Sequence, residues 1–117
     1  MIRPMVLLLV VLDIGFSNAH HGLTNYDTGQ LIELEGIVTD FHLMDPHSIL
    51  VVDVENPDGT RTLWDIEGGS AGGLVSSGLT REYLRSRPRV QVEGYQTRDR
   101  ICAPRCRMAG EDFKFIP

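Results

Sequence analysis

Hydrophobic and polar residues alternate along most of the chain after residue 30, as they do in strands with one buried face. In Leu31–Leu43 the apolar residues occupy even positions first and odd positions later. Such a one-residue shift exchanges the two faces of a strand, and we expect a bulge near Gly36 to produce it, because glycine tolerates the unusual backbone angles. The first strand is therefore predicted to be long and bent.

The remainder of the chain predicts further strands and little helix. Ser48–Glu55 and Thr60–Glu67 are strand-like and flank the turn sequence Asn-Pro-Asp-Gly. The only helical material lies in Gly68–Leu84, where Ser70 and Thr80 are candidate caps of two short turns. The remaining strands are expected at Arg89–Gln96 and, as one or two short pieces, around Cys106–Met108 and Phe113–Ile116.

The predicted order is therefore β-β-β-α-β-β, with the helical segment between the third and fourth strands. This is the layout of the five-stranded OB barrel, closed or partly open, in an all-β fold with one short helix. Closing the sheet hides the strand edges that would otherwise pair with other chains. The alternative is an open β-sandwich or roll.

Composition narrows the function classes. The 117 residues fit one domain, and 42% hydrophobic residues are enough for a core. The net charge of −5 provides no basic surplus to release phosphate counterions, so we expect no nucleic-acid partner. Apolar runs stay shorter than the roughly 18 residues that cross a bilayer, so we expect no transmembrane anchor in the mature protein.

The first 19 residues have the three-part layout of a secretory signal. Arg3 precedes the aliphatic run Val6–Leu12, and Ser17-Asn18-Ala19 places small residues where a signal peptidase cuts, although Asp13 shortens the apolar stretch. The alternative is a buried first strand or helix of a cytosolic protein. We predict a periplasmic protein of a Gram-negative-type cell, with a signal peptide over 1–19, an arm over 20–30 and the barrel over 31–117.

Three motifs follow one another in a specific order. They are Ala19-His20-His21, Asp45-Pro46-His47 and Trp64-Asp65-Ile66-Glu67-Gly68-Gly69-Ser70. In these motifs the chain resembles a family of small exported bacterial proteins of uncharacterised function, which usually carry Asn at the position of Asp45. The resemblance implies a periplasmic OB-like barrel and brings no established activity with it.

The four histidines all lie in the first part of the mature chain. Cleavage after Ala19 leaves a free amine beside the imidazoles of His20 and His21, whereas cleavage after Ser17 places His20 third from the terminus. Either terminus favours Cu(II), which prefers square-planar nitrogen ligands. The sequence therefore predicts copper as a candidate cofactor.

His47 is the candidate third ligand, because the Pro-containing loop after the first strand carries it. Asp45 is a candidate to orient His47 or to add an oxygen ligand. His42 is expected to point to solvent. The alternative is that the terminal histidines belong to a flexible tail and that His47 only caps a turn.

Cys102 and Cys106 have two interpretations. In an oxidising compartment a pair of cysteines normally forms a disulfide. A straight strand would separate their Cα atoms by roughly 13 Å, which exceeds the limit of about 7 Å for a disulfide, so we expect Pro104 to turn the chain back. The rival interpretation is a Cu(I) thiolate pair together with Met108.

Catalysis finds little support in the sequence. The chain has no nucleophile elbow, no His-Glu-x-x-His and no dinucleotide loop. Asp45, His47 and Ser48 are too close in sequence to converge as a triad. We therefore predict a copper-binding protein rather than an enzyme. The alternative is a metal-free accessory module that holds a small ligand or a partner protein on its OB face.

Overall fold

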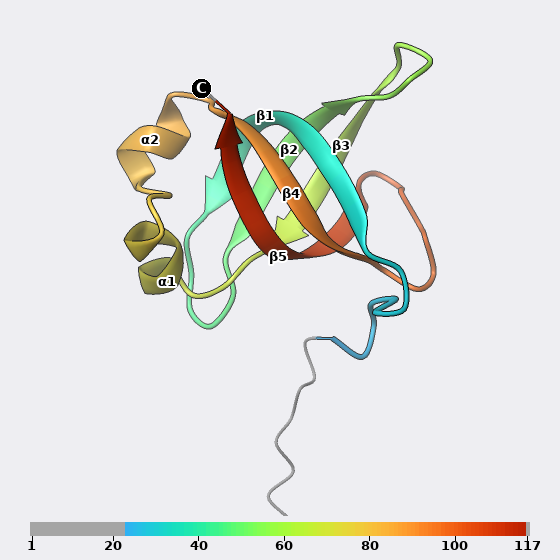
Figure 1. Cartoon of the computed structure of the whole chain (residues 1–117), viewed down its shortest axis with the longest axis horizontal. Helices are drawn as coiled ribbons and strands as arrows, with labels where there is room; N and C mark the ends of the chain where they lie inside the picture. Colours follow the sequence, from blue (N-terminus) through green and yellow to red (C-terminus); the bar gives the residue numbers. More distant parts are fainter. Residues whose placement is uncertain (1–22, 117) are drawn as a thin grey trace, which may run out of the picture.

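The computed structural model describes residues 23–116. Five strands close into a barrel in the order β1-β2-β3-β5-β4 (Figure 1). The strands are β1 Ile32–His42, β2 Ile49–Glu55, β3 Arg61–Glu67, β4 Arg89–Gln96 and β5 Cys106–Ile116. This is the OB arrangement, so the predicted fold class is confirmed and the open sandwich is excluded.

Strand β1 serves both sides of the barrel. Its first half pairs with β4 and its second half with β2, and Ile37 pairs with Arg89 on one side and Asp53 on the other. Every neighbouring pair is antiparallel except β3 and β5, which run parallel and place Trp64 beside Cys106. The parallel pair closes the barrel between segments about 40 residues apart in sequence.

The predicted change of phase in β1 is present, but its position differs from the prediction. The register shifts between Val38 and Asp40 rather than at Gly36, and Phe41 packs on the core beyond the shift. Gly36 is required for a different reason, the close contact between β1 and β2. A Cβ atom there would lie 2.3 Å from the carbonyl oxygen of Asp53, so the close approach of β1 and β2 excludes any side chain.

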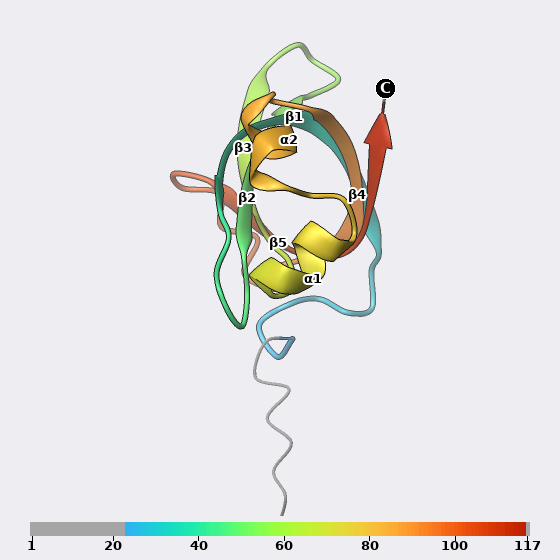
Figure 2. The same cartoon turned by 90° about the vertical axis from the view of Figure 1, so that its left-hand side faces the viewer.

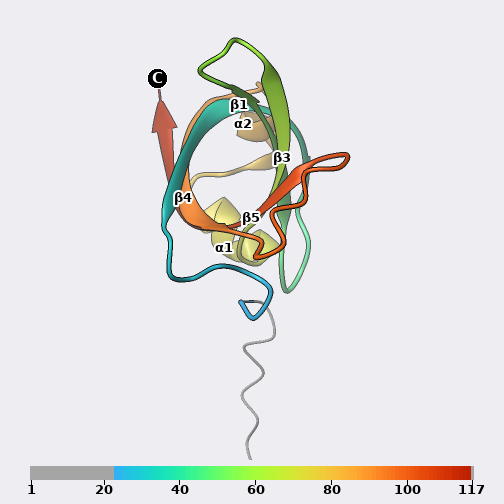
Figure 3. The same ribbon diagram turned by 90° about the vertical axis from the view of Figure 1, so that its right-hand side faces the viewer.

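The core fills the barrel interior, and two short helices extend it. Helices α1 (Ala71–Ser76) and α2 (Arg81–Arg85) lie across one end of the barrel (Figures 2 and 3). Leu74, Leu79 and Leu84 from this segment join the core cluster. Fully buried residues from the strands include Val38, Leu50, Val52, Ile66, Val90, Val92 and Met108.

The two short capped turns predicted in the helical segment are the helices α1 and α2. Ser70 Oγ accepts a hydrogen bond from the Gly73 N–H at 3.2 Å, and Thr80 Oγ1 accepts one from the Tyr83 N–H at 3.1 Å, so both predicted caps are confirmed. Gly78 lies between the helices with a φ of 103°, a conformation that ends the first. In residues 23–116 no helix is long and apolar enough to cross a membrane.

A disulfide joins Cys102 and Cys106, whose Cα atoms are 3.9 Å apart. The predicted pairing is confirmed, and the chain turns back in the segment that contains Pro104. Cys106 is buried at the start of β5, whereas Cys102 is exposed. The last strand forms one 11-residue element instead of the expected short pieces. Its register with β4 shifts between Glu93 and Gly94.

Candidate functional site

The loop between β1 and β2 carries Asp45 and His47. Buried Ser48 fixes its shape, because Ser48 Oγ accepts a hydrogen bond from the Met44 N–H and donates one to the Met44 carbonyl, both at 3.1 Å. Asp45 Oδ1 accepts a hydrogen bond of 3.1 Å from the Ala71 N–H, which ties the loop to the start of α1. The side chain of His47 is left 52% exposed.

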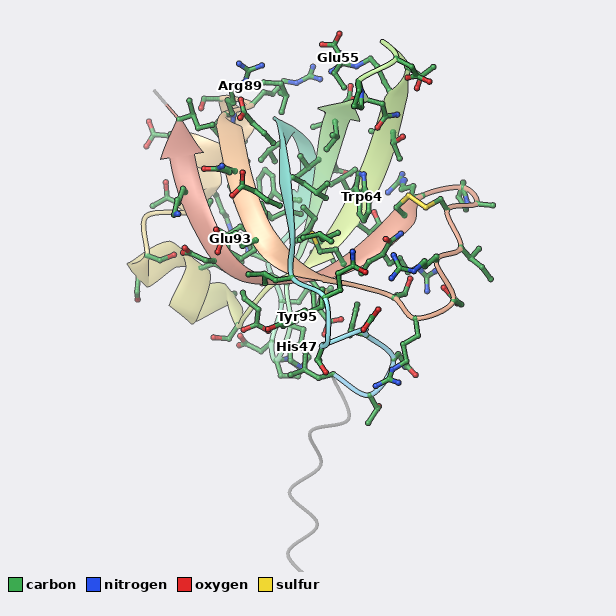
Figure 4. All side chains as sticks on the ribbon, turned by 45° about the vertical axis from the view of Figure 1, so that its right-hand side comes forward. His47, Glu55, Trp64, Arg89, Glu93 and Tyr95 are labelled. Atoms are coloured by element: carbon green, nitrogen blue, oxygen red, sulfur yellow. A yellow bond between two sulfur atoms is a disulfide. The ribbon has the colours of Figure 1, made fainter. Side chains whose placement is uncertain are left out.

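His47 lies against Glu67, the last residue of β3. Its Nδ1 is 3.5 Å from Glu67 Oε1, and Glu67 Oε2 accepts a hydrogen bond of 2.6 Å from the hydroxyl of Tyr26. These side chains form the His47–Glu67–Tyr26 row, which joins the β1–β2 loop, β3 and the N-terminal arm. Figure 4 shows His47 at the end of the barrel where the arm lies.

The phenol of Tyr26 is held in its neutral form. Burial raises the pKa of this phenol well above its ordinary value, and the hydrogen bond to Glu67 and the negative charge of Glu67 raise it further. The positive charge of Arg107 acts in the opposite direction. The neutral Tyr26 hydroxyl donates a hydrogen bond to the Glu67 carboxylate, so the row keeps one fixed direction of hydrogen bonding.

This raised pKa predicts a loss of stability in alkaline solution. Above pH 10 the unfolded chain releases the Tyr26 proton while the folded protein retains it, so the unfolded state binds fewer protons and the free energy of unfolding falls as the pH rises. One proton corresponds to about 1.4 kcal/mol per pH unit. The free energy of unfolding, measured with urea between pH 9 and pH 11, should fall with this slope above pH 10 in the wild type. The slope should be smaller in Tyr26→Phe. An unchanged slope in that variant would contradict the assignment.

The arm is fastened along the β4–β5 loop. Tyr26 pairs with Thr97 as an antiparallel bridge, and the Asp27 N–H donates to the Gln96 carbonyl at 2.8 Å. The guanidinium of Arg100 lies 3.0 Å from the Asp27 carboxylate. The chain is therefore anchored to the barrel only a few residues after the predicted terminal histidines.

The structure brings some of the sequence-predicted residues together and places others apart. His20 and His21 lie outside the described residues. The residue that faces His47 is Glu67, while the carboxylate of Asp45 bonds to the backbone of α1. His42 Nε2 lies 3.6 Å from Asp40, with both side chains exposed. Among residues 23–116, no group of three or more His, Cys, Asp or Glu side chains could hold a metal ion.

Sequence reasoning missed Glu67 and Tyr26. Glu67 could have been found from the alternation along β3. Trp64 and Ile66 face inward, so Glu67 must face outward, beside the β1–β2 loop. No local signal identifies Tyr26, since its role depends on how the arm docks. Ser48 was considered with Asp45 and His47 as a catalytic triad. Its hydroxyl donates a hydrogen bond to the Met44 carbonyl.

A small cavity lies beside the row. It has a volume of about 290 Å³ and is lined by Tyr26, Ile49, Asp65, Glu67 and Arg107. The outer faces of β2, β3 and β5 supply four of these residues, and the arm supplies Tyr26. The lining of this cavity therefore contains the carboxylates of Asp65 and Glu67 and the guanidinium of Arg107.

Two solved structures are similar to the barrel. A mitochondrial single-stranded DNA binding protein from S. cerevisiae, Rim1, has a TM-score of 0.54 and 13% identity, covering 74% of this chain and 93% of its own. The N-terminal domain of the PriB protein from Thermoanaerobacter tencongensis, described as dimeric, has a TM-score of 0.51 and 18% identity, covering 76% and 98%. At these identities the likeness establishes the OB fold alone.

Sequence comparison adds one finding. The model of a family of unknown function, DUF6152, matches residues 9–103. No curated protein matches the chain. The match spans the arm and the barrel as far as the disulfide loop.

Proposed function

Because the chain belongs to DUF6152, a family of unknown function, we propose a role from its own residues: it is an exported OB barrel that binds one Cu(II) ion between its mature N-terminus and His47. The observation that carries the proposal is the His47–Glu67–Tyr26 row. The row ties the arm to the loop that holds the predicted third ligand.

Chain length supports this pairing of ligands. Tyr26 follows His21 by five residues. The Tyr26 N–H donates to the Leu23 carbonyl in a turn, so the segment spans less than the roughly 18 Å of a fully extended chain. Tyr26 and His47 contact the two oxygens of the same carboxylate. The short distance in sequence between His21 and Tyr26 therefore supports a site that joins the terminus to His47.

Glu67 is placed to orient the His47 ring, a role that the sequence analysis assigned to Asp45. Metal-binding histidines commonly present their second ring nitrogen to a carboxylate, which fixes the ring and raises its basicity. Nδ1 of His47 lies against Glu67, so Nε2 is the nitrogen that would bind copper. The amine and imidazoles of the processed terminus supply further nitrogen ligands of the kind Cu(II) prefers.

The proposed role is binding in the periplasm and not catalysis. The polar side chains next to His47 in sequence support this, since Ser48 and Asp45 both form hydrogen bonds to the backbone. If copper does not bind, the remaining hypothesis is a metal-free accessory module for a small ligand or a partner protein.

The test is a Cu(II) titration of the processed protein, preceded by mass spectrometry of its N-terminus. We expect a mature chain that begins at His20 or Asn18 and a Kd in the micromolar range or tighter. His20→Ala and His47→Ala should each weaken binding at least tenfold, and Glu67→Gln should weaken it less, because it removes only the orienting charge.

His42→Ala is the matched control, because it removes an exposed histidine that faces Asp40 instead of Glu67. It should leave the affinity for Cu(II) unchanged. An unprocessed or blocked terminus, or binding that His20→Ala does not alter, would reject the copper site and favour the metal-free module.

A further inference from the structure

A second, larger cavity is lined mainly by residues of the β4–β5 loop, and His47 is not in its lining. Its volume is about 540 Å³, within the range of small-molecule sites. The N-terminal arm contributes Asn25 to its wall, and the loop closed by the disulfide contributes Ile101 and Ala103. Both walls are fixed in place, because the arm bonds to the loop and the disulfide ties the loop to β5.

Three arginines line this cavity in a protein whose net charge is −5. Arg98 donates through Nε to the Tyr26 carbonyl, and Arg105 donates to Asp65 at 3.0 Å. Arg107 has no ion pair with any carboxylate in residues 23–116 and has no hydrogen bond there through its side chain. Guanidinium groups bind carboxylates and phosphates through paired N–H donors, so the free donors here suit an oxyanion.

Thr97 is a buried part of the cavity wall. This residue lines the same cavity and is only 9% exposed. Its Oγ1 is buried and has no hydrogen-bond partner within the described residues. Because this oxygen has no surface open to the cavity, a bound group does not reach it, and the missing hydrogen bond only lowers stability.

We propose that this cavity binds a small molecule that carries an oxyanion, with Arg107 as its principal partner. Arg98 and Arg105 add positive charge, and the apolar side chains of Ile101 and Ala103 accept the body of the ligand. Asp99 is the one carboxylate in the lining, and it accepts a hydrogen bond from the Ile101 N–H. The site is independent of the proposed copper ion.

The surroundings favour a small anion over a nucleic-acid strand. Glu67 and Asp65 line the adjoining hollow, and Arg107 borders both spaces. These carboxylates would repel a long polyanion that extended beyond the larger cavity. A small oxyanion would stay within the arginine-lined cavity. Strand binding by OB folds also uses a row of exposed aromatic side chains, and none of the residues lining the larger cavity is aromatic.

The test uses metal-free protein, titrated with inorganic phosphate and separately with citrate at constant ionic strength. Amide chemical shifts of Thr97, Arg98 and Arg107 report binding. We expect at least one probe to give a saturable shift with a Kd in the low millimolar range or tighter. Arg107→Gln should weaken that binding at least tenfold, and Arg81→Gln, which removes an exposed positive charge on α2, should leave it unchanged.

Thr97→Val is a control for the shape of the cavity wall. This nearly isosteric change removes the buried hydroxyl, so the ligand-free protein should melt at the same temperature as the wild type or higher. Binding of the probe should be unchanged, because the buried Oγ1 does not reach the cavity.

Three outcomes would overturn the proposal. The first is no saturable shift with either probe, and the second is saturable binding that Arg107→Gln does not weaken. The third is a thymidine oligonucleotide that binds in 150 mM salt and displaces the probe, because the cavity would then belong to a nucleic-acid site. Since no metal is present, each outcome is separate from success or failure of the copper titration.

Discussion

Gly94→Ala is expected to lower the free energy of unfolding by about 3 kcal/mol or more, a large part of the stability of a small domain. Gly94 is buried where the register of β4 and β5 shifts. A Cβ atom at this position would lie 1.9 Å from the carbonyl oxygen of Ala109. Because that oxygen belongs to the backbone of β5, the clash is relieved only by separating the two strands.

Urea unfolding followed by fluorescence measures this effect, since Trp64 is the single tryptophan and is buried. Gly72→Ala is the matched control. Gly72 lies in α1, and a Cβ atom added there would have no neighbouring atom within 4 Å. This change should raise the free energy of unfolding by up to about 1 kcal/mol, because alanine loses less backbone entropy in a helix. Equal effects of the two substitutions would contradict the close approach of β4 and β5.

Replacing both cysteines, in Cys102→Ala/Cys106→Ala, should lower the free energy of unfolding by about 2 kcal/mol. The disulfide closes a loop of only a few residues, so it restricts the unfolded chain modestly. Cys106 is 4% exposed, so its replacement also removes packed atoms from the core. The midpoint of urea unfolding should fall in the double variant.

A phosphine reductant provides the control for this prediction. It should lower the midpoint of the wild type toward that of the double variant, and it should leave the double variant unchanged. If the reductant leaves the wild type unchanged while the double variant is still destabilised, the loss of stability in the double variant comes from core packing alone.

The strands and the helix caps were predictable because they depend on local pattern. Alternation placed the strands to within a few residues, and the change of phase in β1 required a bend. The bulge was misplaced, since Gly36 is explained equally well by a bulge or by close contact with another strand. Only the neighbouring Asp53 carbonyl distinguishes the two.

The candidate site was predictable only in part. The disulfide was predictable from a pair of cysteines in a chain expected to be exported, with Pro104 supplying the turn that their spacing requires. Position along the chain identified His47 as a ligand candidate but assigned its carboxylate partner to Asp45, the near neighbour in sequence. The structure instead brings Glu67 to His47 from the end of β3.

The sequence alone therefore determined the strands, the caps and the cysteine pair, because each depends on residues close together in the chain. Tertiary structure alone decided that β3 runs parallel to β5 and that Tyr26 bonds to Glu67, 41 positions away. It also brought Arg98, Arg105 and Arg107 together around one cavity. Such contacts arise when barrel closure brings distant segments together, and no periodicity in the chain encodes which side chains then meet.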